Sequence, residues 1–137
     1  MFMNIPQYNE IPDVGLYLDQ VTKYLNTYLS GSMTPTMVTN YVKLKIVPKA
    51  VKKAYSRDQI AMFFFIALSK QLLSMDQIRT IFTNYENIEE FYTTFKNCLE
   101  GKKCKDPILG KIGSIILQKY ELDSEIEKCL ARGNQNE

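Results

Sequence analysis

The chain has 137 residues, a formal net charge of +2, 45% apolar residues and no histidine. This composition is typical of a soluble globular chain with one core. The absence of histidine excludes Ser-His and Cys-His nucleophilic pairs and imidazole metal ligands. The sequence also shows no paired carboxylates, no glycine-rich phosphate loop and no metal cluster. We therefore expect no enzymatic activity, no cofactor and no metal.

The N-terminus lacks the basic and apolar regions of a signal peptide. The longest apolar run, Ile60 to Leu68, has nine residues, under half of a membrane span. We expect a cytoplasmic protein without membrane contact, in which this run is a buried helix. The three cysteines, Cys98, Cys104 and Cys129, match no zinc spacing. Because Cys98 and Cys129 lie on apolar helical stripes, we expect them to be packed and reduced, as in the cytosol.

The positive charge is concentrated in one segment of the chain. Residues 41–57 contain six basic residues and no acid, whereas residues 1–40 and 58–100 are each net acidic. A solvated surface normally mixes signs, so this asymmetry favours an anionic partner. A second interpretation is that the lysines only keep a loop soluble or protect a strand edge from aggregation. From charge alone we weigh the two interpretations equally.

In chain order, the N-terminal part predicts two helices and a hairpin. Residues 12–29 carry apolar residues at helical spacing, and Ser30–Ser32 ends this helix. Thr34 and Pro35 provide a cap and a favourable first position for a short helix to about residue 44. Residues 46–56, IVPKAVKKAYS, are rich in β-branched residues and contain a proline. They predict two short strands around a basic turn.

Four further helices are predicted from their caps. Ser56 to Gln59 and Ser74 to Gln77 are capping boxes that open helices to about residues 72 and 85. Asn87 can cap a helix to about residue 99, and Asp106 with Pro107 can begin a last helix that reaches about residue 131. This order predicts a mainly α fold: a winged helix-turn-helix domain over residues 10–85 with a short basic β-hairpin wing, and a helical extension over residues 86–132.

Three short motifs resemble a known family. They are T-x-x-M-V-x-N-Y-V-K at residues 34–43, K-K-x-Y-S-R at residues 52–57 and K-Q-x-L-S at residues 70–74. Together they resemble a family of bacterial proteins, domain of unknown function 1836, over about residues 10–85. The family name confers no function by itself.

The same stretch also resembles a diverged MerR-type DNA-binding domain. Residues 38–41 stand where that group has Leu-Arg-Tyr-Tyr, residues 45–48 at its turn, and residues 53–55 at the end of its wing. Thr39 replaces the usual phosphate-binding arginine of the helix, and Lys45 replaces the glycine of the turn. The resemblance implies a second helix in the major groove and a wing along the phosphates.

We therefore expect a sequence-specific protein that binds double-stranded DNA and regulates transcription. The alternative is a protein-interaction module of the same shape that binds an acidic partner through its basic wing. On the first hypothesis, two sets of residues form the DNA-binding site. The phosphate contacts are Lys49, Lys52, Lys53 and Arg57, and the residues facing base edges are Thr36, Thr39, Asn40 and Lys43. A hydrogen bond inside the protein is an equal alternative for Asn40.

The C-terminal segment suggests a separate role. Between Pro107 and Ala131, apolar residues recur at helical spacing. This segment could pair with a copy of itself or fold back on the core. We expect a homodimer through the C-terminal helices, which would double the DNA contacts and fit a two-fold operator.

Overall fold

The computed structural model describes residues 4–29 and 33–135, and the backbone over these ranges is helical without a strand or sheet. The prediction of a mainly α fold is confirmed. The elements are a short 3-10 helix, η1 (Tyr8–Glu10), and the helices α1 (Leu18–Leu29), α2 (Pro35–Lys43), α3 (Arg57–Ser69), α4 (Met75–Thr83), α5 (Ile88–Leu99) and α6 (Pro107–Gln135).

The caps that were predicted from sequence set the starts of four helices. The Thr34 hydroxyl accepts a hydrogen bond from the Met37 amide at 3.1 Å, and α2 follows. Both capping boxes are present, at Ser56 for α3 and at Ser74 for α4, and the Asn87 side chain caps α5. These predictions are confirmed because each depends on side chains within three residues of the backbone they cap.

The predicted start of the first helix, at residue 12, is wrong. Gly15 has a φ of +77°, a left-handed conformation that ends any helix there. Leu16 then exchanges two backbone hydrogen bonds with Tyr55, at 3.1 and 2.7 Å, so α1 begins only at Leu18. The predicted stop of this helix, at Ser30–Ser32, lies outside the described residues.

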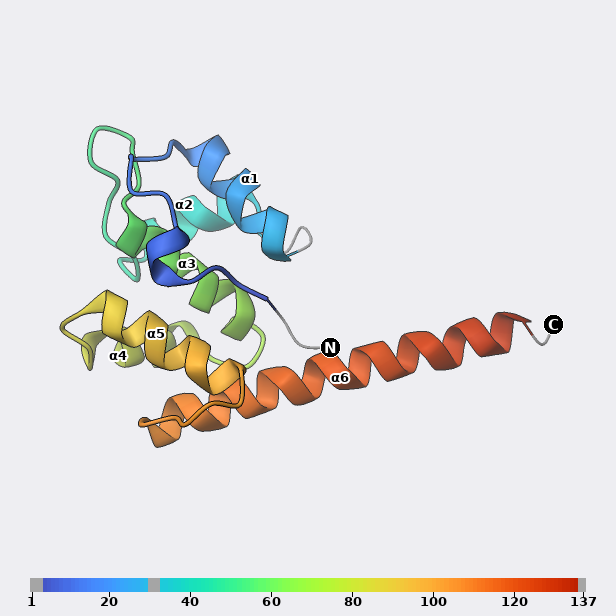
Figure 1. The fold of residues 1–137 in the computed structure, drawn as a ribbon. Coiled ribbons are helices and arrows are strands. Elements are labelled where there is room, and N and C mark those ends of the chain that lie inside the picture. Colours follow the sequence, from blue (N-terminus) through green and yellow to red (C-terminus); the bar gives the residue numbers. More distant parts are fainter. Residues whose placement is uncertain (1–3, 30–32, 136–137) are drawn as a thin grey trace.

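Helix α3 is the centre of the molecule. All residues from Ile60 to Ile66 are buried, as the apolar run predicted. Figure 1 shows α1 and α2 on one side of α3 and α5 on the other, and α3 packs against α1, α5 and α6. The Phe65 ring lies 4.8 Å from that of Phe95 and 5.0 Å from that of Phe91, both in edge-to-face geometry. An element buried on all sides needs apolar residues all round, which explains the run.

The predicted β-hairpin wing is wrong, and with it the winged form of the fold. Residues 44–56, which we call the basic loop, contain one narrow backbone pair, Val51 with Ala54, at 3.0 and 2.9 Å. The arms cannot pair further because the buried amide of Gln59 donates to the carbonyls of Pro48 and Lys49, both at 2.8 Å. Pro48 also has no N–H to give to a ladder. The Gln59 side chain of α3 thus takes the backbone carbonyls that a partner strand would otherwise bind.

The α5–α6 connection is closed by a disulfide between Cys98 and Cys104, so the prediction of a reduced thiol at Cys98 is wrong. The first turns of α6 approach this bond closely. A Cβ at Gly113 would lie 3.2 Å from Cys98 Cβ, and one at Gly110 would lie 3.5 Å from Cys104 Sγ. The contact at Gly110 is an ordinary one, whereas Gly113 leaves room for α6 to pack closely against Cys98 of α5. Cys129 is exposed and unpaired, which also differs from the prediction of a packed thiol.

Candidate nucleic-acid interface

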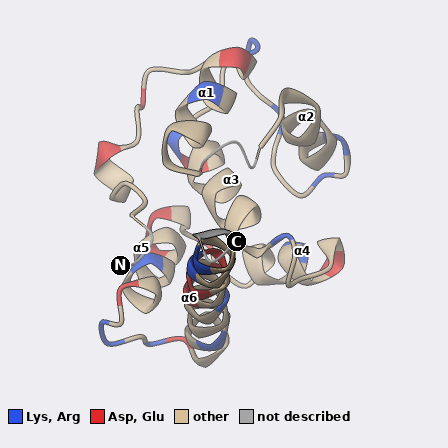
Figure 2. Cartoon of the chain, turned by 90° about the vertical axis from the view of Figure 1, so that its right-hand side faces the viewer, with Lys and Arg blue, Asp and Glu red and all other residues tan. Residues whose placement is uncertain are grey.

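The candidate site residues lie on one face of α2 and on the basic loop. Helix α2 buries Val38 and Tyr41 and leaves the opposite face in solvent. The exposed residues include seven of the eight predicted DNA-binding residues: Thr36, Thr39, Asn40, Lys43, Lys49, Lys52 and Lys53. Figure 2 shows blue segments of the chain beside α2 and a further blue segment at the top of the view, near the red start of α1. The structure therefore brings these seven residues to the surface.

The polar side chains of α2 are available to a ligand. The Thr39 hydroxyl donates to the Thr36 carbonyl at 3.0 Å, which leaves its lone pairs as acceptors. Within the described ranges, the side-chain amide of Asn40 makes no hydrogen bond, and its residue is exposed. An amide of this kind presents donors and an acceptor on one short side chain, which suits bidentate contact with a base edge.

The tip of the basic loop is a two-residue turn made of lysines. Lys52 and Lys53 both have positive φ, 51° and 67°, as a type I′ turn requires. Lys45, just after α2, also has a φ of 60°. These three are the non-glycine residues with positive φ in the part of the chain that the structure describes. Such turns favour Asn and Gly, so each lysine stands where the backbone disfavours it.

The lysines of this surface have no anionic partner among residues 4–29 and 33–135. Lys43, Lys45, Lys49, Lys52 and Lys53 are exposed and take part in none of the four ion pairs of these residues. By contrast, Lys96 pairs with Glu100 at the end of α5, at 2.6 Å, and Lys119 pairs with Asp123 of α6, at 2.7 Å. The surface around α2 therefore carries an uncompensated positive field that attracts anions.

Arg57 differs from the other seven predicted site residues, because its guanidinium contacts the N-terminal segment. Its Nε donates to the Ile11 carbonyl at 2.8 Å, and its Cζ lies 5.4 Å above the centre of the Tyr8 ring. The Tyr8 hydroxyl in turn donates to Asp58. Partial burial and the Asp58 carboxylate both raise the pKa of Tyr8, so the hydroxyl keeps its proton and donates. Arg57 thus ties the start of α3 to residues 8–11, and its contact with a phosphate stays a prediction.

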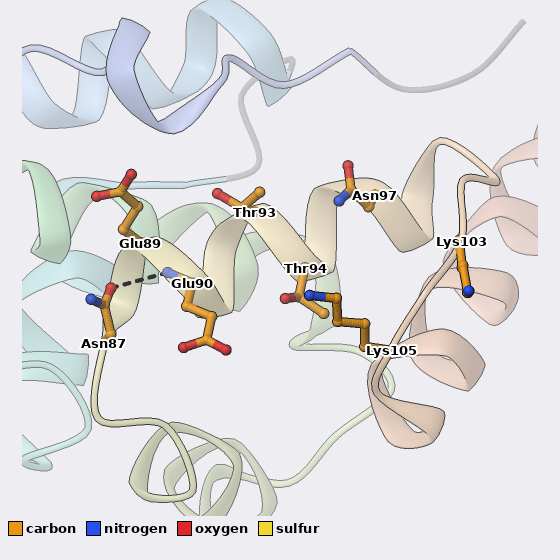
Figure 3. A pocket seen from close by; sticks show the side chains of 8 residues that line it. All are labelled: Asn87, Glu89, Glu90, Thr93, Thr94, Asn97, Lys103 and Lys105. Atoms are coloured by element: carbon orange, nitrogen blue, oxygen red, sulfur yellow. Dashed lines mark hydrogen bonds between the residues drawn. The ribbon is translucent and has the colours of Figure 1, made fainter.

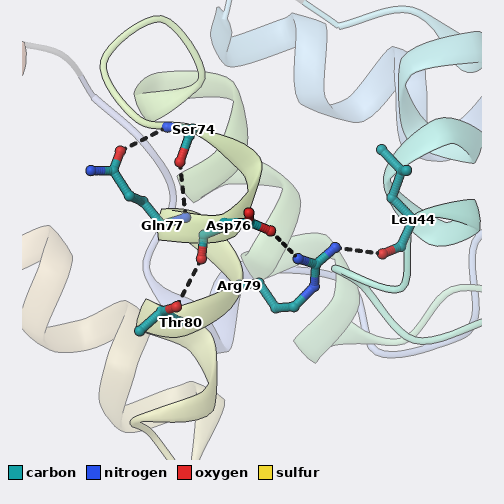
Figure 4. Close-up of polar contacts among 6 residues, drawn as sticks. All are labelled: Leu44, Ser74, Asp76, Gln77, Arg79 and Thr80. Carbon is teal, nitrogen blue, oxygen red and sulfur yellow. Dashed lines mark hydrogen bonds and ion pairs between the residues drawn. The ribbon is translucent and has the colours of Figure 1, made fainter.

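A groove of about 580 Å³ lies between the basic loop and α4. Lys43, Lys45, Lys49 and Arg79 line it together with apolar side chains that include Ile46 and Phe82. Figure 4 shows how Arg79 reaches across from α4: its guanidinium donates to the Leu44 carbonyl at 2.8 Å and to Asp76 Oδ1 at 2.6 Å. Arg79 therefore holds the start of the basic loop against α4.

Sequence reasoning did not select Lys45 or Arg79. Asp76 lies three residues before Arg79, so the sequence indicated only an ion pair within one helix. Nothing local in the sequence indicates the contact with Leu44, which is 35 residues away. Lys45 belongs to the run of basic residues, and its position after a short helix was the available signal, since left-handed residues commonly follow helix ends.

A second depression, of about 440 Å³, lies on the outer face of α5. Figure 3 shows Glu89 and Glu90 near one end of this depression and Lys103 near the other end. Lys105 lies beside Thr94. The lining is polar and of mixed sign, with no nucleophile beside a base. Throughout residues 4–29 and 33–135, no group of three or more Cys, Asp and Glu is placed to hold a metal ion. We therefore assign no chemistry to this depression.

Comparison with known protein families places residues 6–99 in the family described as Domain of unknown function (DUF1836). The match covers about two thirds of the chain, so the chain belongs to this family, and the resemblance predicted from its motifs is confirmed. No curated protein and no solved structure matches the chain. The comparisons thus add no support to the resemblance to MerR-type domains. In the described ranges, no helix is long and apolar enough to cross a membrane.

Proposed function

We propose that the chain binds double-stranded DNA through the exposed face of α2 and the basic loop, and that it acts as a sequence-specific transcriptional regulator in the cytoplasm. The observation that carries this proposal is the placement of lysine at all three left-handed non-glycine positions of the described residues. A residue with a Cβ in this conformation costs about 1–2 kcal/mol. These positions carry charged side chains, although Asn or Gly would make the fold more stable.

This placement argues against lysines that serve only solubility. A soluble loop could carry its charges on neighbouring residues with ordinary φ, such as Lys49, without strain. The tip of a two-residue turn, however, is the point that projects farthest from a loop. Backbone strain retained at an exposed site is a reason to infer a binding role. Lys52 and Lys53 are therefore the residues that we assign to phosphate contact first.

The two parts of the surface have different roles in this proposal. Lys49, Lys52 and Lys53 neutralise phosphates and position the protein. At about −0.9 per phosphate, these three contacts give a slope of about −2.7 for log K against log salt. Thr36, Thr39, Asn40 and Lys43 face the bases, with Asn40 suited to adenine and Lys43 to guanine. Arg57 adds a fourth phosphate contact only if its contacts with residues 8–11 break.

The second candidate function is binding of an acidic protein, and the groove beside α4 favours it. There, apolar side chains such as Ile46 and Phe82 lie below the rim lysines. Phosphates need only the charges, whereas a protein partner would also use the apolar floor. Duplex binding that persists when Ile88, a partly buried residue of the same groove, is replaced by alanine separates the two functions.

The test of the DNA proposal is the double substitution Lys52→Asn and Lys53→Gly. Asn-Gly is the preferred sequence of a type I′ turn, so we expect the free energy of unfolding to rise by about 1–2 kcal/mol. We expect affinity for a random duplex at low salt to fall about tenfold or more, and the salt slope to weaken by about 1.8. If the variant is more stable but binds the duplex less tightly, misfolding cannot explain its loss of affinity.

The matched control is Lys103→Asn with Lys105→Asn, in the loop between α5 and α6. Both lysines are exposed, and the control removes the same net charge far along the chain from the basic loop. We expect its duplex affinity to stay within about twofold of wild type. Equal losses in the two variants, or no binding of wild-type protein to any duplex at low salt, would contradict the proposal.

We also infer that two copies of the chain associate through α6, which would present two copies of the DNA surface to a two-fold operator. The support is the long C-terminal helix, whose last turns leave the body of the molecule, as Figure 1 shows.

A further inference from the structure

We propose that α6 pairs in antiparallel orientation with α6 of a second copy, and that the distal half of each helix covers an apolar groove on the other copy. The groove lies between the ends of α1 and α3 and the middle of α6. This arrangement rests on the self-association proposed above but does not depend on DNA binding.

The distal half of α6 has no support from its own chain. Every residue from Glu125 to Gly133 is exposed, although the helix continues to Gln135. In Figure 1 this part of α6 extends away from all other helices. An isolated helical segment shorter than about 12–15 residues is marginal in water even with good helix formers. A stable distal half therefore needs a partner surface.

An apolar stripe that the fold leaves uncovered runs from the first half of α6 into its distal half. Ile115, Leu122, Ile126 and Leu130 are 48%, 49%, 46% and 64% exposed. Their spacings of seven, four and four residues place them on one face of the helix. A stripe of this kind on a free helix is the usual sign of a helix-to-helix interface.

The stripe leads directly into the groove, which has a volume of about 740 Å³. Ile115 and Leu122 belong to both, and from the body of the molecule Tyr28 and Leu72 line the groove while each is more than a third exposed. The uncovered apolar surface of the body and that of the distal helix are therefore neighbours, on either side of Leu122.

A single two-fold axis near Leu122 covers both surfaces. With the helices antiparallel, Leu130 lies eight residues beyond Leu122, about 12 Å along the helix, and so reaches the level of the partner's Ile115. The same operation places the partner's distal stripe in the groove of the first copy. A parallel pair instead places stripe against stripe and leaves both grooves open to solvent.

Charge favours the same orientation. Residues 121–127 contain four acids, Glu121, Asp123, Glu125 and Glu127, and no base. In a parallel pair these acids lie beside their own copies, which is destabilising. In the antiparallel pair about Leu122, Glu121 and Asp123 still lie opposite the partner's Asp123 and Glu121, but Glu125 and Glu127 are moved away from their own copies. Fewer like charges therefore meet than in the parallel pair.

The first test is the oligomeric state of the full chain. We expect sedimentation to give a dimer at about 50 µM. Ile126→Glu with Leu130→Glu should give a monomer with an unchanged fold, because these exposed side chains lie in the unsupported half of α6. The control is Ile108→Glu, which is 58% exposed in the first turn of α6, lies outside the groove and should stay dimeric. A wild-type monomer would overturn the proposal.

The second test is orientation, and it uses the exposed Cys129. In the antiparallel pair, a cysteine at position 118 lies within three residues of the level of the partner's Cys129 and on the same side of the stripe. Mild oxidation of Gln118→Cys should give a crosslinked dimer whose peptides join 118 to 129, whereas wild-type protein should not crosslink. A 129–129 link in wild type would overturn the antiparallel orientation and leave the dimer standing. The Lys52→Asn, Lys53→Gly variant should still dimerise, which separates this result from DNA binding.

Discussion

The centre of α3 and the basic loop differ in how far the needs of folding explain their residues. Around α3, apolar side chains are buried from Ile60 to Ile66, and the polar ends of the helices are capped. In the basic loop, by contrast, lysines are exposed, lack ion pairs within the described residues, and three of them occupy left-handed backbone. Folding accounts for nearly every residue of the first region. It does not account for the lysines of the second region, which is why we propose a binding role for them.

The sharpest way to test this comparison is Phe65→Ala. The Phe65 side chain is fully buried and its ring contacts those of Phe82, Phe91 and Phe95, so it joins α3 to α4 and α5. We expect the free energy of unfolding to fall by about 3–5 kcal/mol, measured by urea denaturation. A loss below about 1 kcal/mol would mean that the aromatic cluster is not the core of the protein.

The second prediction concerns Arg57, which lies at the boundary of the two regions. Arg57→Met keeps the apolar stem but removes the hydrogen bonds to the Ile11 and Asn9 carbonyls. We expect a loss of about 1–3 kcal/mol in the free energy of unfolding, because a buried Ile11 segment loses its donor. Duplex affinity should change by less than about twofold at temperatures where the variant is folded.

The opposite result for Arg57 is equally informative. An unchanged free energy of unfolding with a salt slope weaker by about 0.9 would return Arg57 to the phosphate contacts that the sequence predicted. The basic loop would then extend to the first residue of α3.

The sequence predicted most of α2 to α5, because each begins at a cap made by neighbouring residues. It could not predict the absence of strands in the basic loop. That outcome depends on Gln59, whose amide donates to the carbonyls of Pro48 and Lys49, eleven and ten residues away. The same glutamine was correctly predicted to form a capping box, which its oxygen makes with the Ser56 amide at 2.7 Å. Gln59 thus makes both contacts, and the sequence indicates only the one with Ser56, three residues away.

For the candidate site, composition located the surface but not its geometry. The basic run and the helical spacing of α2 predicted eight site residues, of which seven are exposed and Arg57 is partly buried. The left-handed φ at Lys45, Lys52 and Lys53 was not predictable, because lysine is not typical of such turns. The disulfide was missed for a related reason. Cys98 lies on an apolar stripe, and only the path of residues 99–103 brings Cys104 to it.

The third prediction uses pH to probe a cap far from the basic loop. Asp106 Oδ1 accepts from the amides of Ile108 and Leu109 at 2.9 and 3.1 Å, and its Oδ2 accepts from the Tyr85 hydroxyl at 2.5 Å. Partial burial alone would raise the pKa of Asp106, but these hydrogen bonds together lower it. A carboxylate with a lowered pKa stabilises the fold above its ordinary pKa, and this contribution is lost as pH falls through the lowered value.

Two variants separate the cap from the charge. Asp106→Ala should lower the free energy of unfolding by about 1 kcal/mol at pH 7. Asp106→Asn keeps an acceptor but cannot titrate, so wild type should exceed it in stability at pH 7 and lose that advantage below about pH 4. A gap between wild type and Asp106→Asn that stays constant down to pH 3 would contradict the lowered pKa.

The smallest expected effect is the most direct test of strain in the basic loop. Lys45 follows α2 with a φ of 60°, and its amide donates to the Val42 carbonyl at 2.9 Å. Glycine adopts this conformation freely, so Lys45→Gly should raise the free energy of unfolding by about 0.4–1 kcal/mol. Lys49→Gly, at a residue without positive φ in the same loop, should lower it by a similar amount because glycine adds chain entropy to the unfolded state. Opposite signs at two lysines of equal charge would show that the backbone at position 45, and not its charge, opposes folding. If Lys45→Gly also weakens duplex binding, the strained lysine is retained for the ligand, and the groove beside α4 belongs to the DNA surface.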